Sequence, residues 1–244
     1  MSRKKAAVIL AAGQGKRMGS DLPKVLHEIN GRPIIHILLD SILEIEFEKI
    51  VVVVGYKGEL LVQALKDYQL KTVWQREQLG TGHAVKMAGS ELADFDGDTL
   101  IALGDVPFLS ANSVRKLFEQ KEKDSSSAVC LSTILEDSSG YGRIVRDKNS
   151  FFLSEIVEDK DASDEIKEIK EINSGTFCFD NKLLFEMLNQ LKNDNSQGEY
   201  YLTDTIKLLN DKNLKVSMVV CENPDEVRGV NSKEQLEYLE KKFH

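Results

Sequence analysis

The chain has 244 residues, of which 41% are hydrophobic and 30% are charged. This balance is typical of a globular protein and excludes a fibrous or wholly disordered one; the length suits one large domain better than two independent ones. The net charge of −8 argues against nucleic acid or an anionic membrane as partner, whereas a local cationic site on an acidic protein suits small anions.

Cysteine and histidine usage indicates neither disulfides nor zinc. The three cysteines, Cys130, Cys178 and Cys221, are far apart and show no paired spacing, which predicts buried free thiols in a reducing compartment. The four histidines show no zinc-ligand spacing, among themselves or with the cysteines. No apolar run is long enough to span a membrane and the N-terminus carries no signal-peptide pattern, so the expected location is the cytoplasm.

Predicted strands and helices alternate through residue 134. Strands are expected at 6–10, 49–54, 71–74, 99–103 and 128–134. Helices are expected from Pro33 onward, at 58–68, at 80–95, and from a cap at Asn112 or Ser113 to 121. Four consecutive valines at 51–54 are typical of a central parallel strand. The alternation predicts an α/β fold, with a mainly parallel sheet and helices on both faces.

The pattern changes after this first part, which we place at about 1–134. Short strands at 143–146 and 151–156 accompany a charged run at 158–171, interpreted as solvated surface with a short helix near Ile166 and Ile169. We therefore predict a small inserted β lobe at about 135–175. Strands at 176–180 and 215–220, with helices at 183–191, 202–212 and 232–242, return to the main body, so that 1–244 form a single domain.

A glycine-rich loop follows the first predicted strand and reads LAAGQGKRMGSDLPKVL. It is not a dinucleotide fingerprint, because Met18 stands where a third glycine is needed and the second strand ends at Gly55 rather than near an acid. It is not a Walker loop either, because neither Gly13 nor Gly15 has Gly, Lys and Ser or Thr at the required offsets. Redox and P-loop chemistry are thereby disfavoured.

The composition of this loop suits a triphosphate. Backbone amides near the glycines and the cations Arg17 and Lys24 can converge on phosphate oxygens. In nucleotidyl transfer the attacked α-phosphorus gains negative charge as pyrophosphate leaves, so positioned cations lower the barrier. A basic surface loop without a ligand is the alternative.

Two further segments suit the same chemistry. Asp105 follows a buried strand in the sequence GDVP, where one carboxylate could hold Mg²⁺ while phosphate oxygens and water complete the shell; an ordinary turn aspartate is the alternative. The segment QREQLGTGHA begins at Gln75, and its amide and backbone groups could read the edge of a uracil; a plain helix-start turn is the alternative.

Together these segments resemble a known family. LAAGQGKRM, LPKVLH, QLGTGHA, GDVP, GYGRIV, IVEDKDA, EIN-x-G, QGEYYLTD and GVN occur in the order of the uridyltransferase domain of the bacterial N-acetylglucosamine-1-phosphate uridyltransferase, over about residues 5–236. The resemblance implies a Rossmann-like nucleotidyltransferase fold, with a nucleotide-binding part at about 1–134 and an inserted sugar-binding lobe at about 135–175. It also implies synthesis of UDP-N-acetylglucosamine, used in cell-wall biogenesis, and pyrophosphate from UTP and N-acetylglucosamine 1-phosphate, with Mg²⁺ as cofactor.

Carried over by motif, the resemblance implies a role for each site residue. The nucleotide would contact Leu10, Ala11, Ala12 and Gly13, with Arg17 and Lys24 as catalytic cations on its phosphates, and Gln75, Gly80 and Thr81 on uracil. Asp105 and Asn231 would bind magnesium, with Leu103 and Gly104 beside the substrates. Gly142, Glu158 and Asn173 would hold the sugar, in a pocket shaped by Tyr200, Tyr201 and Thr203.

The chain departs from the family pattern without removing an implied ligand. Lys16 stands where Thr is usual, Leu103 where an aromatic is common, and Ser174 where Thr is usual. The hexapeptide repeats of the family's β-helical acetyltransferase are missing, so a separate acetyltransferase is expected for the preceding step. The alternatives are a nucleotidyltransferase for another sugar or polyol phosphate and a non-catalytic UDP-sugar-binding protein.

Overall fold

Strand β1 (Lys5–Ala11) lies inside the sheet, and both of its faces are buried. The computed structural model describes residues 3–147 and 152–243. Successive side chains of a strand point to opposite faces. Accordingly, Ala7 and Ile9 pack into one hydrophobic core, and Ala6 and Val8 pack into a second core on the other side of the sheet.

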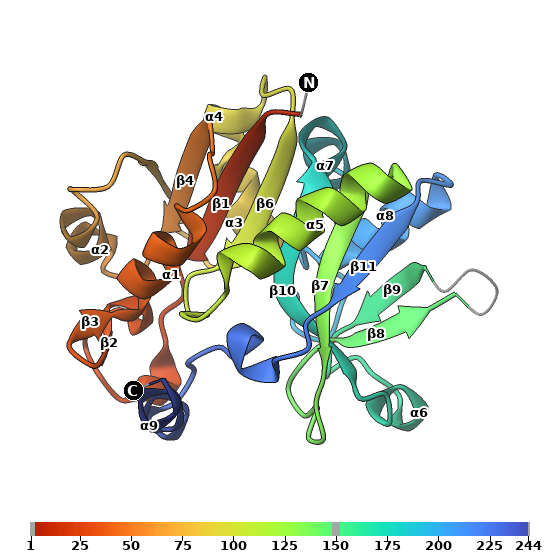
Figure 1. Cartoon of the computed structure of the whole chain (residues 1–244). Coiled ribbons are helices and arrows are strands. Elements are labelled where there is room, and N and C mark those ends of the chain that lie inside the picture. The colour runs from red at the N-terminus through yellow and green to blue at the C-terminus, as the bar shows by residue number, and fades with distance from the viewer. Residues whose placement is uncertain (1–2, 148–151, 244) are drawn as a thin grey trace.

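The sheet is mainly parallel, with strand order β11-β7-β10-β6-β1-β4-β5 (Figure 1). Only β10 runs antiparallel to its neighbours β6 and β7 among the pairs on this path. A hairpin of β8 and β9 joins β10 where Ile172 lies opposite Arg143. The remaining bounds are β2 (Glu28–Ile29), β3 (Arg32–Pro33), β4 (Lys49–Val54), β5 (Lys71–Trp74), β6 (Asp98–Leu103), β7 (Ala128–Ile134), β8 (Arg143–Arg146), β9 (Leu153–Val157), β10 (Glu171–Asp180) and β11 (Val216–Val220).

Helices cover both faces of the sheet. Buried side chains of α1, α2 and α5 share one core with the sheet, and those of α3, α4, α7 and α8 share the other, so α5 lies in front of the sheet in Figure 1. The helices are α1 (Ile34–Ile42), α2 (Gly58–Ala64), α3 (Thr81–Met87), α4 (Gly89–Leu92), α5 (Ala111–Asp124), α6 (Asp164–Lys167), α7 (Asn181–Leu188), α8 (Asp204–Asp211) and α9 (Lys233–Lys242). Short 3₁₀ helices are η1 (Lys16–Met18), η2 (Lys24–Leu26) and η3 (Pro224–Val227).

This architecture confirms the predicted α/β class, the mainly parallel sheet and the small β lobe. Three helix predictions need correction. The helix expected at 80–95 is interrupted at Ala88, which separates α3 from α4, and it ends at Leu92. The helix expected at 58–68 ends at Ala64, and α5 is capped by Ser110, which accepts a hydrogen bond from the Ser113 N–H, rather than by Asn112 or Ser113.

The lobe is continuous with the main sheet. β10 begins inside the lobe and ends beside β6, so the two parts share one strand, and the boundaries at 134 and 175 stay a prediction. Of the strand expected at 151–156, residue 151 lies outside the described residues, and β9 begins at Leu153. The run 158–171 contains the expected short helix, but Glu158 and Glu171 at its ends are only partly exposed.

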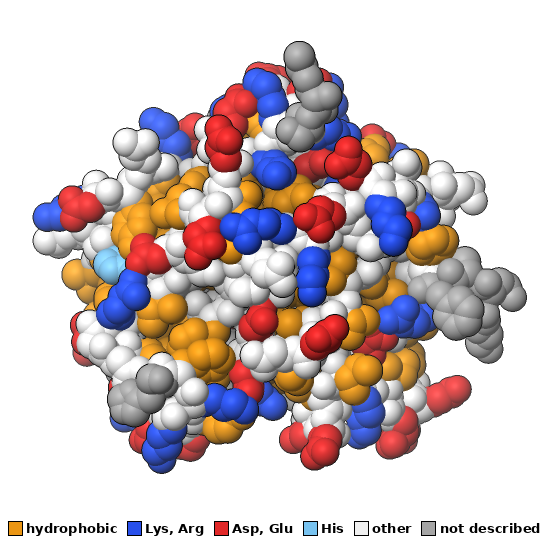
Figure 2. Space-filling model, viewed as in Figure 1, with side chains coloured by type: hydrophobic (Ala, Val, Ile, Leu, Met, Phe, Trp, Pro, Cys, Tyr) orange, Lys and Arg blue, Asp and Glu red, His pale blue; other side chains and the backbone are white. Residues whose placement is uncertain are grey.

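The surface and the cysteines agree with a globular protein. Figure 2 shows acidic and basic side chains interspersed over one face. All three cysteines are buried and free of disulfides, as predicted. A helix with the length and hydrophobicity needed to cross a bilayer is absent from the described part of the chain.

Candidate active site

Two adjoining cavities lie where β1 and β6 end. The loop cavity, of about 300 Å³, is lined by Leu10, Ala11, Ala12, Gly13, Lys24, Val25, Gln75, Gln78, Gly80, Thr81, Ala84, Leu103, Asp105 and Glu199. The lobe cavity, of about 190 Å³, also touches Leu10, Thr81, Leu103 and Asp105, and it extends to Tyr141, Gly142, Glu158, Asn173, Thr203 and Asn231. Ligands of open α/β sheets bind beyond the carboxyl ends of the strands, which is where both cavities lie.

Glycines hold the loop of the first cavity against the sheet. Gly15 has φ of +62°, and a β-carbon there would lie 2.7 Å from Cβ of Lys24. Gly55 at the end of β4 would place a β-carbon 2.7 Å from the Ala12 carbonyl oxygen. Both positions therefore require glycine for close packing, and they fix the backbone that carries Ala12, Gly13 and Lys24.

Lys24 links two acceptors that are distant in the sequence. Its Nζ donates to Oδ2 of Asp105 and, at 2.9 Å, to Oδ1 of Asn231. The side chains of Lys24 and Asp105 are 15% and 12% exposed. The Asp105 carbonyl accepts from the Val230 N–H at 2.8 Å, so the GVN segment is held directly beside the end of β6.

Gln75 and Thr81 use part of their hydrogen-bonding capacity within the protein. Buried Gln75 donates from Nε2 to the Gly80 carbonyl at 3.0 Å and contacts Nδ1 of His83 at 3.1 Å. Thr81 Oγ1 accepts from the Leu202 N–H at 3.0 Å. The side-chain amide oxygen Oε1 of Gln75 and the Thr81 hydroxyl hydrogen therefore remain to meet a ligand in the loop cavity.

The lobe cavity contains a carboxylate and an amide. Burial raises the pKa of Glu158, and a 2.9 Å hydrogen bond from Thr203 Oγ1 opposes the rise. Asn173 donates its N–H to the Gly142 carbonyl at 2.8 Å, and its Oδ1 accepts from the Gly175 N–H at 2.9 Å. Packing leaves little room around these groups, since a β-carbon on Gly142 would lie 3.0 Å from Ile156.

Several predicted residues lie elsewhere. Arg17 is exposed, lines neither cavity and makes no hydrogen bond or ion pair with a described residue. Tyr200 contributes its backbone, because its carbonyl accepts from the Gly82 N–H at 2.8 Å. Tyr201 is buried, and its hydroxyl hydrogen-bonds Gln197 and Asp161 outside the cavity linings. The side chain of Lys16 lies outside the described part of the structure.

Sequence reasoning missed some lining residues. Gln78 and Glu199 face the loop cavity, and Tyr141 faces the lobe cavity. All three lie inside segments that the motif comparison had already marked, so position within a motif was the available signal. Which side chain of a segment points inward depends on the turn geometry, and the sequence does not display that geometry.

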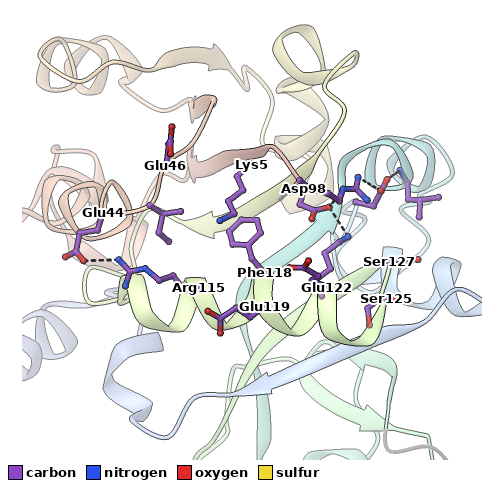
Figure 3. Close-up of a pocket in the computed structure, with 16 residues that line it drawn as sticks. Lys5, Glu44, Glu46, Asp98, Arg115, Phe118, Glu119, Glu122, Ser125 and Ser127 are labelled. Atoms are coloured by element: carbon purple, nitrogen blue, oxygen red, sulfur yellow. Dashed lines mark hydrogen bonds and ion pairs between the residues drawn. The ribbon is translucent and has the colours of Figure 1, made fainter. Parts of the chain in front are cut away.

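A larger cavity of about 680 Å³ lies at the opposite ends of the strands, near the first residues of β1 and β6 (Figure 3). Several of its charged side chains pair with one another: Lys121 lies 2.8 Å from Asp98, and Arg115 lies 3.4 Å from Glu44. Lys5 points over the Phe118 ring. This cavity lies at the amino ends of β1 and β6, whereas ligands of open α/β sheets bind beyond the carboxyl ends, so we place the candidate site at the carboxyl ends.

Comparisons with known proteins identify close relatives. The family model described as a MobA-like NTP transferase domain matches residues 7–209. The bifunctional protein GlmU of Listeria innocua is 45% identical over 230 residues, which are 94% of this chain and 50% of that protein. The GlmU of Caldicellulosiruptor saccharolyticus is 46% identical over 239 residues, covering 97% and 51%. The chain thus spans about half the length of these curated relatives.

The fold is also shared with more distant proteins. A crystal structure of UDP-glucose pyrophosphorylase complexed with UDP-glucose matches with a TM-score of 0.77, covering 98% of each chain at 18% identity. The apo form of UDP-glucose pyrophosphorylase matches with a TM-score of 0.76. At this identity the likeness concerns the fold alone, and it confirms the predicted nucleotidyltransferase fold.

Proposed function

The chain belongs to the family of MobA-like NTP transferase domains, and on that premise we propose that it forms UDP-N-acetylglucosamine and pyrophosphate from UTP and N-acetylglucosamine 1-phosphate. The observation that carries the proposal is the pair of cavities that meet at Asp105. A transferase must hold two substrates with their reacting atoms adjacent, and this arrangement offers one cavity to each. The order of motifs and the 45% identity to GlmU support the choice of substrates.

The loop cavity is the proposed UTP site. Backbone groups of Ala12 and Gly13 would meet the nucleotide, and the side-chain oxygen Oε1 of Gln75 would accept the N–H of uracil. Lys24 would donate to phosphate oxygens and stabilise the charge that develops on the α-phosphate. Arg17 is free to turn toward the outer phosphates because no described partner restrains it.

The lobe cavity is the proposed site of the sugar phosphate. Glu158, once ionised, would accept hydrogen bonds from sugar hydroxyls, and the amide of Asn173 would donate to the sugar or its acetamide. The phosphate of the sugar would then lie toward Asp105, which lines both cavities. An oxygen of the sugar phosphate would attack the α-phosphorus of UTP directly, because the site motifs contain no nucleophilic Ser or Cys beside a base.

A magnesium ion is proposed as cofactor, held by Asp105 and Asn231. Oxygens of both side chains converge on one cation, the Lys24 ammonium, so their placement fits a metal ion as well. Within 3–147 and 152–243, no group of three or more His, Cys, Asp or Glu side chains could hold a metal alone. Phosphate oxygens and water would therefore complete the shell, as Mg²⁺ prefers. When bound, the metal would neutralise charge on the phosphates.

Pyrophosphate release tests the proposal. We expect release when the protein is mixed with UTP, N-acetylglucosamine 1-phosphate and Mg²⁺, and a loss of about 10² to 10³-fold in rate for Lys24→Ala or Asp105→Ala. Turnover by both variants equal to that of the wild type would contradict the assignment. A panel of other nucleotides and sugar phosphates separates the alternative substrates, and product binding without turnover would indicate a UDP-sugar-binding protein.

A further inference from the structure

Lys24 occupies the position that a metal ion would need. We infer that in the nucleotide-free protein the Lys24 ammonium fills the cation position between Asp105 and Asn231, so that a divalent cation binds there only after a polyphosphate draws Lys24 away. The inference rests on the proposed function, since it concerns the same metal and nucleotide. It adds an order of binding, in which the metal enters with or after UTP.

The two acceptors are held in place while the lysine side chain can swing. Asp105 is fixed through its carbonyl and the Val230 N–H, and Asn231 donates its own N–H to Gln235 Oε1 at 2.7 Å. Gly229 packs beside both, since a β-carbon there would lie 3.2 Å from Asp105 Oδ2 and from Asn231 Nδ2. The Lys24 Cβ packs closely against Gly15, and the rest of the side chain borders the loop cavity.

One ammonium therefore faces two sets of anionic groups. Toward β6 it has Asp105 and Asn231, and toward the loop it would have the phosphates of a bound nucleotide. With both side chains at most 15% exposed, the Lys24–Asp105 attraction is poorly screened by solvent, and a metal would have to overcome it. Two protein oxygens without a third acidic ligand bind a free divalent cation weakly, whereas a nucleotide adds further oxygens.

Competition of this kind makes the binding of the metal and the binding of the polyphosphate depend on each other. If a polyphosphate removes Lys24 from the acceptors, it strengthens metal binding, and the metal strengthens polyphosphate binding by the same factor. Replacing Lys24 by an uncharged side chain should remove the competition directly. Metal binding without nucleotide should then become tighter, although the same change weakens turnover.

Binding of Mn²⁺, followed by electron paramagnetic resonance of the free ion, tests the inference on the full chain. Without nucleotide, we expect Lys24→Met to bind Mn²⁺ on the order of tenfold more tightly than wild type, within the usual range of site-to-site coupling. Lys24→Gln is a second variant, and the double variant Lys24→Met with Asp105→Asn should lose the gain. Lys4→Met is the control, because Lys4 pairs with exposed Glu48 and the net charge changes equally.

The outcomes separate this inference from the proposed function. If wild type binds Mn²⁺ in the presence of UTP, after correction for Mn²⁺ bound by UTP itself, but Lys24→Met and Lys24→Gln bind it no tighter than wild type without UTP, the inference is wrong and the proposed function stands. The inference is also wrong if Lys24→Met gains no more affinity for Mn²⁺ than the control Lys4→Met does. If no Mn²⁺ binds to wild type or variants with or without UTP, both fail.

Discussion

At the scale of single residues, Glu158 should make stability depend on pH. Burial raises its pKa from the ordinary value of 4.5. The folded protein thus binds this proton more tightly than the unfolded chain does, so the free energy of unfolding should fall as pH rises from about 4.5 through the raised folded pKa. Glu158→Gln should lack this decrease, which urea denaturation at a series of pH values would measure.

Thr203 offers an internal control for the same titration. Its hydroxyl donates a hydrogen bond to Glu158, which lowers the pKa of that carboxyl group. Thr203→Val should therefore raise the pKa of Glu158 further, so that the loss of stability continues to a higher pH. A difference in unfolding free energy between wild type and Glu158→Gln that stays constant from about pH 4 to pH 8 would contradict the assigned cause.

Gly175 makes a second prediction at this scale. It has φ of +78°, and a β-carbon would lie 2.4 Å from Cδ1 of Leu103, which lines both cavities. Gly140 has φ of +79° with open space around it, so Gly140→Ala isolates the cost of the backbone conformation. We expect Gly140→Ala to cost about 1 kcal/mol and Gly175→Ala about 1–3 kcal/mol more, because the added methyl group displaces Leu103.

Denaturant unfolding of the two glycine variants measures this difference. Gly175→Ala with Leu103→Ala should recover part of the extra loss, since the shorter side chain leaves room for the methyl group, although Leu103→Ala carries a cost of its own. Equal losses for Gly140→Ala and Gly175→Ala would show that Leu103 gives way freely.

At the scale of helices and strands, the sequence predicts elements whose cause is local. β4 is fully specified by its run of valines, and β1 by the apolar residues before the glycine loop. The interruption between α3 and α4 falls at Ala88, next to Gly89, and a single glycine in an apolar helical pattern does not by itself predict a break. The Ser110 cap was missed because Asn112 and Ser113, which are also good caps, lie only two and three residues after it.

At the scale of the whole molecule, the candidate site combines several segments. The sequence indicates each segment as functional, but it does not show which residues of different segments are in contact. The motif order placed Lys24, Asp105 and Asn231 in one site, yet nothing in their spacing shows that Lys24 contacts both acceptors, which lie 81 and 207 residues away. The partners of Gln75 and Thr81 likewise depend on how the 199–202 segment returns to α3. Tertiary contacts of this kind decide which atoms remain for a ligand.

The two cavities adjoin at Asp105 but extend along different segments of the chain, so ligands of different length should protect these segments differently. Under the proposed function, UMP would occupy the loop cavity alone, whereas UDP-N-acetylglucosamine would extend past Asp105 to Glu158 and Asn173 of the lobe cavity. Hydrogen exchange should therefore slow near residues 10–13 and 75–84 with either ligand, and near 140–146 and 156–162 with the UDP-sugar only. Glu158→Ala should abolish the lobe protection and leave the loop protection intact. If UMP protects the lobe as fully as the UDP-sugar does, the two cavities do not divide the substrates as proposed.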